Sequence, residues 1–387
     1  QRQEYRMIEV ERERRRWNMG VYLNPGNEKF AKAVQSEIYV DKTGLIEYTN
    51  QVINTVQRYV CVSRPRRFGK SMTADMLTAY YGKECDSREL FSGLKISQNA
   101  VFAQHLNQYP TIFLNMQEFL SRSRDVYDLL ERMKKLVLRD MKREYPDVDY
   151  FDENDLIEAM QDVYEETRRP FVVIIDEWDC IFRENKKDTE AQKKYLDFLR
   201  NLLKDRNYVG LTYMTGILPI KKYGSHSALN MFDEFSMIYA GPLAKFVGFT
   251  ETEVRELCEK YHMDMREIRE WYDGYRFENC EPVYNPRSVV NGMLFGSIRN
   301  YWNMTESFEA LQTYIDMNFE GLKDDILSML AGEHIPVNTG NFTNDMTTFW
   351  DENDDSVYRE LPTGKGFADM VFIPRKKFPD KPALVVE

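Results

Sequence analysis

The sequence predicts an α/β fold in which helices flank a parallel β-sheet, and two stretches of the chain carry this prediction. The first is a basic turn, Arg64–Ser71, which lies between a β-rich run at residues 58–63 and a helix-like run at residues 71–81. The second is Phe171–Ile175, five apolar residues that are mostly β-branched and are followed by two acidic residues. A continuous apolar run of this kind is typical of a strand buried on both faces, as in parallel sheets.

The order of strand, turn and helix around the basic turn supports a parallel sheet. The run after the turn is predicted to be helical because apolar side chains recur at the spacing of one helix face, and Gly82 suits a helix C-terminus. Two more β-rich runs, at residues 111–115 and 208–214, would complete the sheet. The apolar positions of the helix are Met72, Met76, Leu77 and Tyr80.

The basic turn ends in Gly69-Lys70-Ser71, the closing part of the nucleotide-phosphate loop pattern G-x-x-x-x-G-K-[ST]. In that loop, backbone N–H groups at a helix N-terminus hold the phosphates, the lysine reaches the outer phosphates and the serine hydroxyl reaches Mg²⁺. Arg64 occupies the position of the first glycine, and the alternative is a chance Gly-Lys-Ser in a basic turn. We predict that ATP and Mg²⁺ bind to a loop region made of Arg64, Arg66, Arg67, Phe68, Gly69, Lys70, Ser71 and Met72.

The three arginines of the turn are candidate phosphate ligands. A guanidinium group can bind a phosphate through two parallel hydrogen bonds. One or more of Arg64, Arg66 and Arg67 would then stand in for the backbone N–H groups that a loop with the first glycine offers to the phosphates. The alternative is that they face solvent or pair with nearby acids.

The two acidic residues after the second apolar run are the predicted partners of the loop. Asp176 and Glu177 follow a strand whose carboxyl end lies at the edge where open α/β sheets bind ligands. Buried acids are costly unless they meet a cation, so we assign Mg²⁺ coordination to Asp176 together with Ser71, and activation of the attacking water to Glu177. The alternative is a strand that simply exits into solvent.

A further strand between the two motifs, with Glu177 directly after Asp176, indicates the branch of P-loop ATPases that carries a catalytic glutamate. Thr215, at the end of the run at 208–214, would be a polar sensor of the γ-phosphate or of the water. We therefore predict catalytic roles for Lys70, Glu177 and Thr215.

Several motifs together resemble the predicted AAA-ATPase-like family, over residues 19–345 and again over 358–387. The resemblance implies ATP binding and hydrolysis, a C-terminal PD-(D/E)-x-K nuclease-like domain, and a loop in which the arginine at position 64 is usual. Arg276 is a candidate lid arginine over the nucleotide, with a structural pair to Asp273 or a neighbour as the alternative. The motifs are Tyr39–Thr43, Arg64–Ser71, Ile175–Glu177, Thr215–Leu218, Trp271–Phe277 and Tyr284–Pro286.

The C-terminal residues predict a hairpin with a second metal site. Strand-like runs at 369–373 and 383–387 flank a polar turn, and a hairpin centred on Phe378 sets Asp369 opposite Glu387. Two carboxylates at one hairpin end can bind Mg²⁺, and residues 364–387 look like the D…(D/E)-x-K core of the nuclease superfamily. The chain stops at Glu387 without the expected lysine, and the resemblance breaks at about residues 351–358, so we expect an incomplete nuclease; a plain edge hairpin is the alternative.

From about residue 250 the chain is predicted to be helical, with short helices at 251–261 and 264–272 and a capping box from Thr250 to Glu253. A helical lid after a P-loop sheet is common in AAA-like ATPases. The predicted segments are a charged leader at 1–18, an ATPase domain at 19–248, a helical lid region at 249–345 and a partial nuclease-like segment at 346–387.

Charge and composition limit the partners. The chain has 52 Lys and Arg against 63 Asp and Glu, a net charge of −11, which argues against nucleic-acid binding by the whole surface. A local basic channel at the C-terminal segment, around Lys365 and Lys381, leaves DNA as a partner there, with a solvated turn as the alternative. Five scattered cysteines and the lack of a long apolar run predict a cytoplasmic protein without a membrane span.

Our interpretation is thus a Mg²⁺-dependent P-loop ATPase coupled to a nuclease-like segment. Two other interpretations remain open: a nucleotide-gated binding module without significant turnover, and a nuclease that the ATPase region only regulates.

Overall fold

The computed structural model describes residues 20–299, except for residues 84, 186–187, 221–228, 238, 273 and 278, and the strands at 356–363, 366–373 and 384–386. The chain divides into two compact units, residues 1–298 and 299–387. The predicted boundary between the ATPase domain and the lid region, at 248/249, falls within the first unit. The helices of residues 249–298 therefore belong to the same unit as the sheet. The predicted segment limits stay predictions. The predicted leader at 1–18 and the part of the predicted lid region after residue 299 lie outside the described residues.

A parallel sheet forms the centre of the first unit, as predicted, and it has five strands. Its strand order is β2-β3-β4-β1-β5, so β4 separates the strand before the basic turn from the strand before the acidic pair. The apolar run that predicted β3 is buried along its whole length. The sequence analysis missed β5, a short strand with two acidic residues and one phenylalanine. The strands are β1 (Tyr59–Ser63), β2 (Thr111–Asn115), β3 (Phe171–Asp176), β4 (Val209–Gly216) and β5 (Asp233–Phe235).

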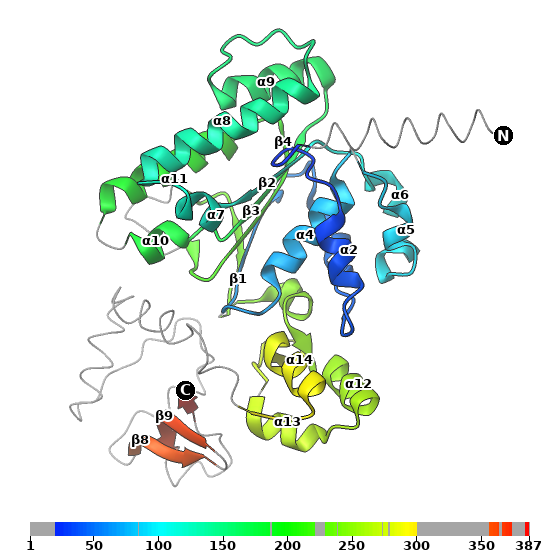
Figure 1. Ribbon diagram of the computed structural model, residues 1–387, viewed down its shortest axis with the longest axis vertical. Coiled ribbons are helices and arrows are strands. Elements are labelled where there is room, and N and C mark those ends of the chain that lie inside the picture. The colour runs from blue at the N-terminus through cyan, green and yellow to red at the C-terminus, as the bar shows by residue number, and fades with distance from the viewer. Residues whose placement is uncertain are drawn as a thin grey trace, which may run out of the picture. The chain divides into compact units, whose positions relative to one another are not determined.

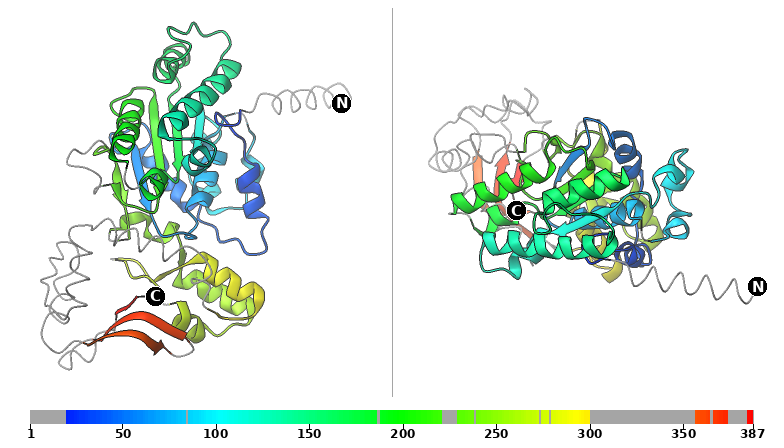
Figure 2. Two further views of the ribbon diagram at one scale, coloured as in Figure 1. Left: turned by 60° about the vertical axis from the view of Figure 1, so that its left-hand side comes forward. Right: turned by 90° about the horizontal axis from the view of Figure 1, so that it is seen from above.

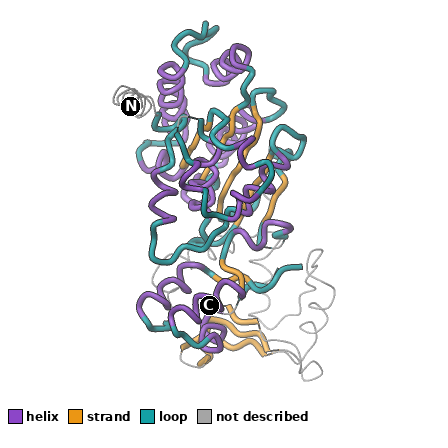
Figure 3. Tube along the Cα trace, turned by 90° about the vertical axis from the view of Figure 1, so that its right-hand side faces the viewer, coloured by secondary structure: helices purple, strands orange, loops and turns teal. Residues whose placement is uncertain are grey.

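Helices cover both faces of this sheet (Figure 1). One face carries α2 (Glu28–Val34), α4 (Lys70–Tyr81), α5 (Arg88–Phe91) and α6 (Phe102–His105). The other face carries α7 (Met116–Ser121), α8 (Val126–Glu144), α9 (Leu156–Thr167), α10 (Cys180–Glu184) and α11 (Thr189–Leu203). Figure 3 shows the strands enclosed by these helices. The remaining elements of this region are α3 (Gly44–Val52) and the 3₁₀ helices η1 (Lys95–Gln98) and η3 (Gly241–Phe246).

The strand–loop–helix unit that the sequence predicted is present, with one difference in the helix. Helix α4 begins at Lys70, directly after the loop, and Met76, Leu77 and Tyr80 are buried as expected. Met72 was predicted on the same apolar face, but its side chain is 42% exposed. The reason is its place in the first turn of α4, at the open edge of the sheet rather than over it.

A small helical region follows the sheet within the first unit (Figure 2). Thr250 and Glu253 form the predicted capping box at the start of α12. Glu253 also pairs with Lys42, whose Nζ donates to the carbonyl oxygen of Lys245 at 2.8 Å. The motif at residues 39–43 thus ties this region to the N-terminal part of the sheet domain. The elements are β6 (Phe249–Thr250), α12 (Glu251–Tyr261), α13 (Met265–Tyr272), β7 (Val283–Tyr284) and α14 (Pro286–Phe295).

The second unit contains an antiparallel three-stranded sheet of order β10-β9-β8, from β8 (Ser356–Thr363), β9 (Gly366–Ile373) and β10 (Leu384–Val386). Leu384 pairs with Phe372 and Val386 with Met370, so each pair is equidistant in sequence from residue 378. This is the predicted register. Asp369 lies in β9, whereas Glu387 lies outside the described residues. The sequence analysis missed β8.

Among the helices that the structure describes, none has both the length and the apolar character that crossing a membrane requires.

Candidate functional site

The turn between β1 and α4 presents an open helix N-terminus. Gly69 precedes α4 with φ of +91°, a left-handed conformation that suits glycine, and a Cβ atom there would meet nothing within 4 Å. No side chain caps the helix, and no described group accepts a hydrogen bond from the N–H groups of Lys70, Ser71 or Met72. Unpaired N–H groups at the positive end of a helix dipole suit an anion.

Lys70 lies beneath the turn rather than in solvent. Its buried Nζ donates hydrogen bonds to the carbonyl oxygens of Arg64 and Pro65, both at 2.9 Å. Burial lowers the pKa of Lys70, and the acidic groups Glu177, Asp179 and Asp176 oppose this effect. The amine is therefore close to the predicted acidic pair, and its two hydrogen bonds connect the start of α4 to the first residues of the loop.

Arg64 takes an unexpected position for a phosphate ligand. Its side chain is 0% exposed, and its Nη1 donates to the carbonyl oxygens of Ser63 and Phe235, both at 2.9 Å. The guanidinium carbon lies 5.2 Å from the centre of the Phe277 ring, and burial lowers the pKa of Arg64 to about 10. Its Nε and Nη2 have no hydrogen-bond partner among the described residues. This arginine thus joins the loop to β5 and to the helical region.

The other loop residues differ in exposure. Phe68 is buried and packs edge-on against Tyr275 with ring centres 5.3 Å apart, while Ser71 is exposed at the start of α4. Arg66 is half-buried, and Arg67 is exposed with φ of +69°. Arg276, the predicted lid arginine, is exposed.

Asp176 stands at the carboxyl end of β3 between two polar neighbours. It is buried, and its Oδ1 accepts a hydrogen bond from Thr215 Oγ1 on β4. Its Oδ2 accepts one from Asn115 Nδ2 at 3.4 Å, since Asn115 is its register partner on β2. The ends of three strands thus bring Asp176 and Thr215 together, as the sequence predicted for strand-end residues.

Glu177 is oriented by an ion pair that the sequence did not reveal. Its φ is +57°, and its carboxylate accepts a hydrogen bond from Arg183 Nη2 on α10. Burial raises the pKa of Glu177, and the cations Lys70 and Arg183 oppose that effect. The same Arg183 reaches Asp179 through Nε at 3.2 Å, and Asp179 Oδ2 also accepts the backbone N–H groups of Ile217 and Leu218.

Four polar residues near the site were missed: Asn115, Asp179, Arg183 and Asp75. Asn115 could have been found, because it ends a predicted strand just as Asp176 does. Asp75 lies one turn after Ser71 on α4; burial raises its pKa to about 6, with Asp176 adding to the effect and Lys29 opposing it. The positions of Asp179 and Arg183 depend on the turn after β3, for which the sequence offers no periodic signal.

The residues at this edge fit a hard divalent cation. Asp176 is a buried carboxylate, and no described lysine or arginine forms an ion pair with it. A buried carboxylate without such a partner is costly, and a magnesium ion with its water shell would offset that cost. The hydroxyl of Ser71 lies at the exposed start of α4, where P-loop proteins use it as a ligand.

Strand order and site geometry together define a class of protein. A loop with an open helix N-terminus follows β1, an acidic pair lies at the end of β3, and a threonine lies near the end of β4, the strand between β1 and β3. This is the arrangement of a P-loop ATPase with an additional central strand. The family described as predicted AAA-ATPase matches residues 26–225, and the chain belongs to this family.

One curated relative and several solved structures are similar to the chain. A protein of Azotobacter chroococcum mcd 1, described as an uncharacterized protein in the vnfD 5′ region, is 28% identical over 286 residues, covering 72% of this chain and 52% of its own length. The chain thus spans about half the length of this relative. Among solved structures, the Aeropyrum pernix ORC2 protein in ADPNP–ADP complexes is 10% identical with a TM-score of 0.37, covering 79% of this chain and 80% of its own. The Aeropyrum pernix ORC1 protein in complex with DNA is 12% identical with a TM-score of 0.35, covering 76% and 66%.

Proposed function

We propose that this protein binds ATP with Mg²⁺ and hydrolyses it at the carboxyl edge of the parallel sheet. The observation that carries the proposal is the convergence there of Lys70, at the start of α4, with Asp176 and Thr215, at the ends of the neighbouring strands β3 and β4. Family membership points to the same chemistry.

In this proposal the loop and α4 bind the phosphates. The open N–H groups of the first turn of α4 donate to the phosphate oxygens, and Lys70 exchanges its carbonyl partners for the β- and γ-phosphates. Ser71 and Asp176 would hold Mg²⁺, which when bound neutralises phosphate charge. Arg64, Arg66, Arg67 and Arg276 remain proposed phosphate contacts, of which Arg64 would have to leave its buried place.

Glu177 is the proposed general base. A water oxygen attacks the γ-phosphorus, the bond to the β–γ bridging oxygen breaks, and the water proton passes to the Glu177 carboxylate. Thr215 is the proposed sensor, since its hydroxyl already contacts Asp176. Glu177 must first leave Arg183, so the ion pair represents a resting arrangement.

The test is ATP turnover and ATP affinity of Glu177→Gln in the full chain. We expect turnover to fall by about 100-fold or more, with ATP affinity retained, because the amide cannot take the proton. Glu184→Gln is the matched control, because Glu184 is an exposed glutamate on the neighbouring helix α10. Equal turnover in wild type and Glu177→Gln would show that Glu177 is not the general base.

A second function is favoured by the Glu177–Arg183 ion pair itself. If that pair persists with ATP bound, the protein would be a nucleotide-gated binding module without turnover. Tight ATP binding without release of inorganic phosphate, in wild type as in Glu177→Gln, would support this function over hydrolysis.

The C-terminal metal pair and action on DNA are also proposals. The described register of β9 and β10 supports the hairpin on which Asp369 and Glu387 were predicted to face each other. Cleavage of DNA that requires Mg²⁺ and is lost in Asp369→Ala, in a version extended past residue 387, would support a nuclease. No cleavage by the extended version would remove this proposal.

A further inference from the structure

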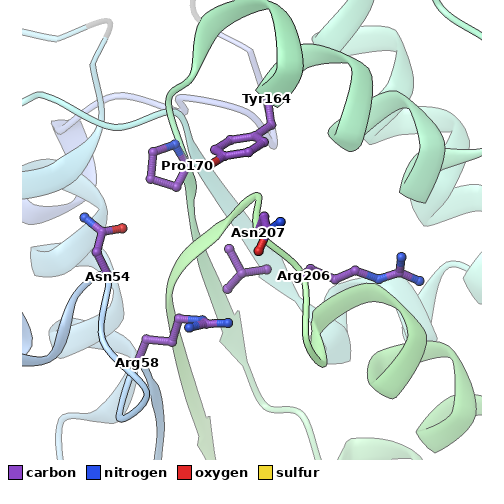
Figure 4. A pocket seen from close by; sticks show the side chains of 7 residues that line it. Asn54, Arg58, Tyr164, Pro170, Arg206 and Asn207 are labelled. Carbon is purple, nitrogen blue, oxygen red and sulfur yellow. The ribbon is translucent and has the colours of Figure 1, made fainter.

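A polar pocket lies at the opposite edge of the sheet from the nucleotide loop. It has a volume of about 360 Å³, within the range of small-molecule sites. Because the strands are parallel, the residues just before β1, β3 and β4 meet at the amino edge. These residues line the pocket together with the end of α9 and the segment after α3 (Figure 4). They include Arg58, Pro170, Arg206, Asn207, Tyr164 and Asn54.

Arg58 is the residue that suits this pocket to an anion. Its Nη1 donates to the carbonyl oxygen of Thr55 at 3.1 Å and its guanidinium lies over the Tyr59 ring, but its buried Nε has no hydrogen-bond partner among the described residues. Because Arg58 lines the pocket and its guanidinium is positively charged, an oxyanion in the pocket can pair with it.

No ion pair among the described residues neutralises the positive charge of the pocket. In the part of the chain that the structure describes, no carboxylate lies within ion-pair distance of Arg58 or Arg206. This is notable in a chain with 63 acidic residues and a net charge of −11. Arg206 points away from the pocket centre in Figure 4, where its Nε donates to the carbonyl oxygen of Asn201 at 2.9 Å, so it contributes charge at the rim.

The remaining lining residues offer hydrogen bonds and one apolar wall. Asn54 and Asn207 are exposed and bring amide groups that can donate to an oxyanion or to a ligand hydroxyl. The Tyr164 ring and Pro170 lie next to each other on one side of the pocket. A ring contacts the planar or apolar body of a small ligand better than it contacts a bare ion.

We propose that this pocket binds a small organic anion, whose phosphate or carboxylate head pairs with Arg58 and whose body packs against Tyr164 and Pro170. The site is separate from the nucleotide loop, since the two lie at opposite ends of the same strands. It does not depend on the ATPase proposal.

The experiment measures binding of radiolabelled pyrophosphate to the full chain by equilibrium dialysis, without nucleotide. We expect two equivalents to bind to wild type, one at the loop and one at this pocket, and one to Lys70→Ala. In the Lys70→Ala background, Arg58→Gln should weaken the remaining site by about tenfold or more, since a charged hydrogen bond is removed. Competition by unlabelled phosphate and by citrate then shows which oxyanion the pocket prefers.

Arg168→Gln is the matched control, because Arg168 is an exposed arginine near the pocket that does not line it. It should change affinity less than about twofold. Equal weakening by Arg168→Gln would show general electrostatic attraction and overturn the proposal, as would unchanged affinity in Arg58→Gln.

A second variant keeps the test decisive if Arg58→Gln does not fold. Asn207→Asp alters an exposed residue and places a carboxylate in the pocket, which should weaken pyrophosphate binding at this site alone. Unchanged binding in that variant also overturns the proposal. If the nucleotide loop does not bind pyrophosphate, the dialysis result is different: Lys70→Ala would then bind as many equivalents as wild type does.

Discussion

The positively charged side chains at the two edges of the central sheet differ in their partners. At the carboxyl edge, Lys70 is hydrogen-bonded to two loop carbonyls and Arg183 is paired with two carboxylates. At the amino edge, Arg58 has a carbonyl and an aromatic ring but no described carboxylate partner. A ligand at the carboxyl edge must therefore displace contacts that already exist, whereas a ligand at the amino edge would complete contacts that are missing.

This difference follows from the direction of the strands. Acidic and polar residues end β3 and β4, and the turns after them bring further acids such as Asp179 to the same edge. The short segments before β1, β3 and β4 instead carry arginine, proline and asparagine. Substitutions at each edge test this contrast.

Lys70→Ala should have the largest effect. Removing the amine that is proposed to contact the outer phosphates should weaken ATP binding by about 100-fold, because hydrogen bonds from charged groups contribute about 1.5–3 kcal/mol. Isothermal titration with a non-hydrolysable ATP analogue measures this. Lys194→Ala, at an exposed position of α11, is the control and should bind as wild type does. An unchanged dissociation constant in Lys70→Ala would show that the loop does not bind the phosphates.

Arg183→Gln tests whether charge at the carboxyl edge is balanced internally. The Arg183 side chain is 7% exposed, and its removal leaves Asp179 buried without its cation. We expect the free energy of unfolding to fall by about 3 kcal/mol, measured by urea denaturation. Arg200→Gln breaks an exposed pair with Asp197 and should cost less than about 1 kcal/mol. If the two variants are equally stable, the Arg183 cluster is not a buried ion-pair network.

The sequence predicted which residues of the carboxyl edge lie at the ends of strands. Apolar runs locate β1 to β4, and a polar residue directly after such a run must lie at the carboxyl edge, so Asp176 and Thr215 were found. The hairpin of β9 and β10 was found in the same way, from two apolar runs around a polar turn. Strand β5 was missed because Asp233–Phe235 has no apolar run.

Contacts between distant segments were beyond sequence reasoning. Arg64 was expected to reach phosphate, yet its place depends on a carbonyl of β5 and on the Phe277 ring, neither of which any local pattern connects to the loop. Likewise, the pairing of Glu177 with Arg183 depends on the positive φ of Glu177 and the path into α10. Which charged residues pair across a turn can be known only from the fold, whereas the residues at strand ends can be located from the sequence.

Asp75→Asn tests how a buried acidic group at the carboxyl edge makes the free energy of unfolding depend on pH. Burial raises the pKa of Asp75 to about 6, whereas in the unfolded chain it loses its proton near pH 4. The neutral form is thus favoured by folding, and the free energy of unfolding should fall as pH rises from about 4 to about 6 and then stay level. The variant should lack this fall and should be more stable at pH 7 by about 1–3 kcal/mol.

Urea denaturation at pH 4.5 and pH 7 measures this effect, with Asp147→Asn at an exposed position as the control. A less stable Asp75→Asn at pH 7 would mean that the carboxylate is ionised and engaged in the fold.

Arg58→Gln should have the smallest effect on stability and gives the sharpest test of the contrast between the edges. Because no described carboxylate depends on Arg58, the variant gives up one hydrogen bond to a carbonyl and one ring contact, and the free energy of unfolding should change by about 1 kcal/mol or less. Arg183→Gln, the same substitution at the other edge, should cost about three times as much. Urea denaturation of both variants measures the difference. Equal destabilisation would mean that Arg58 has a buried counter-charge after all, and the amino edge would then have no unmet positive charge for an anion to neutralise.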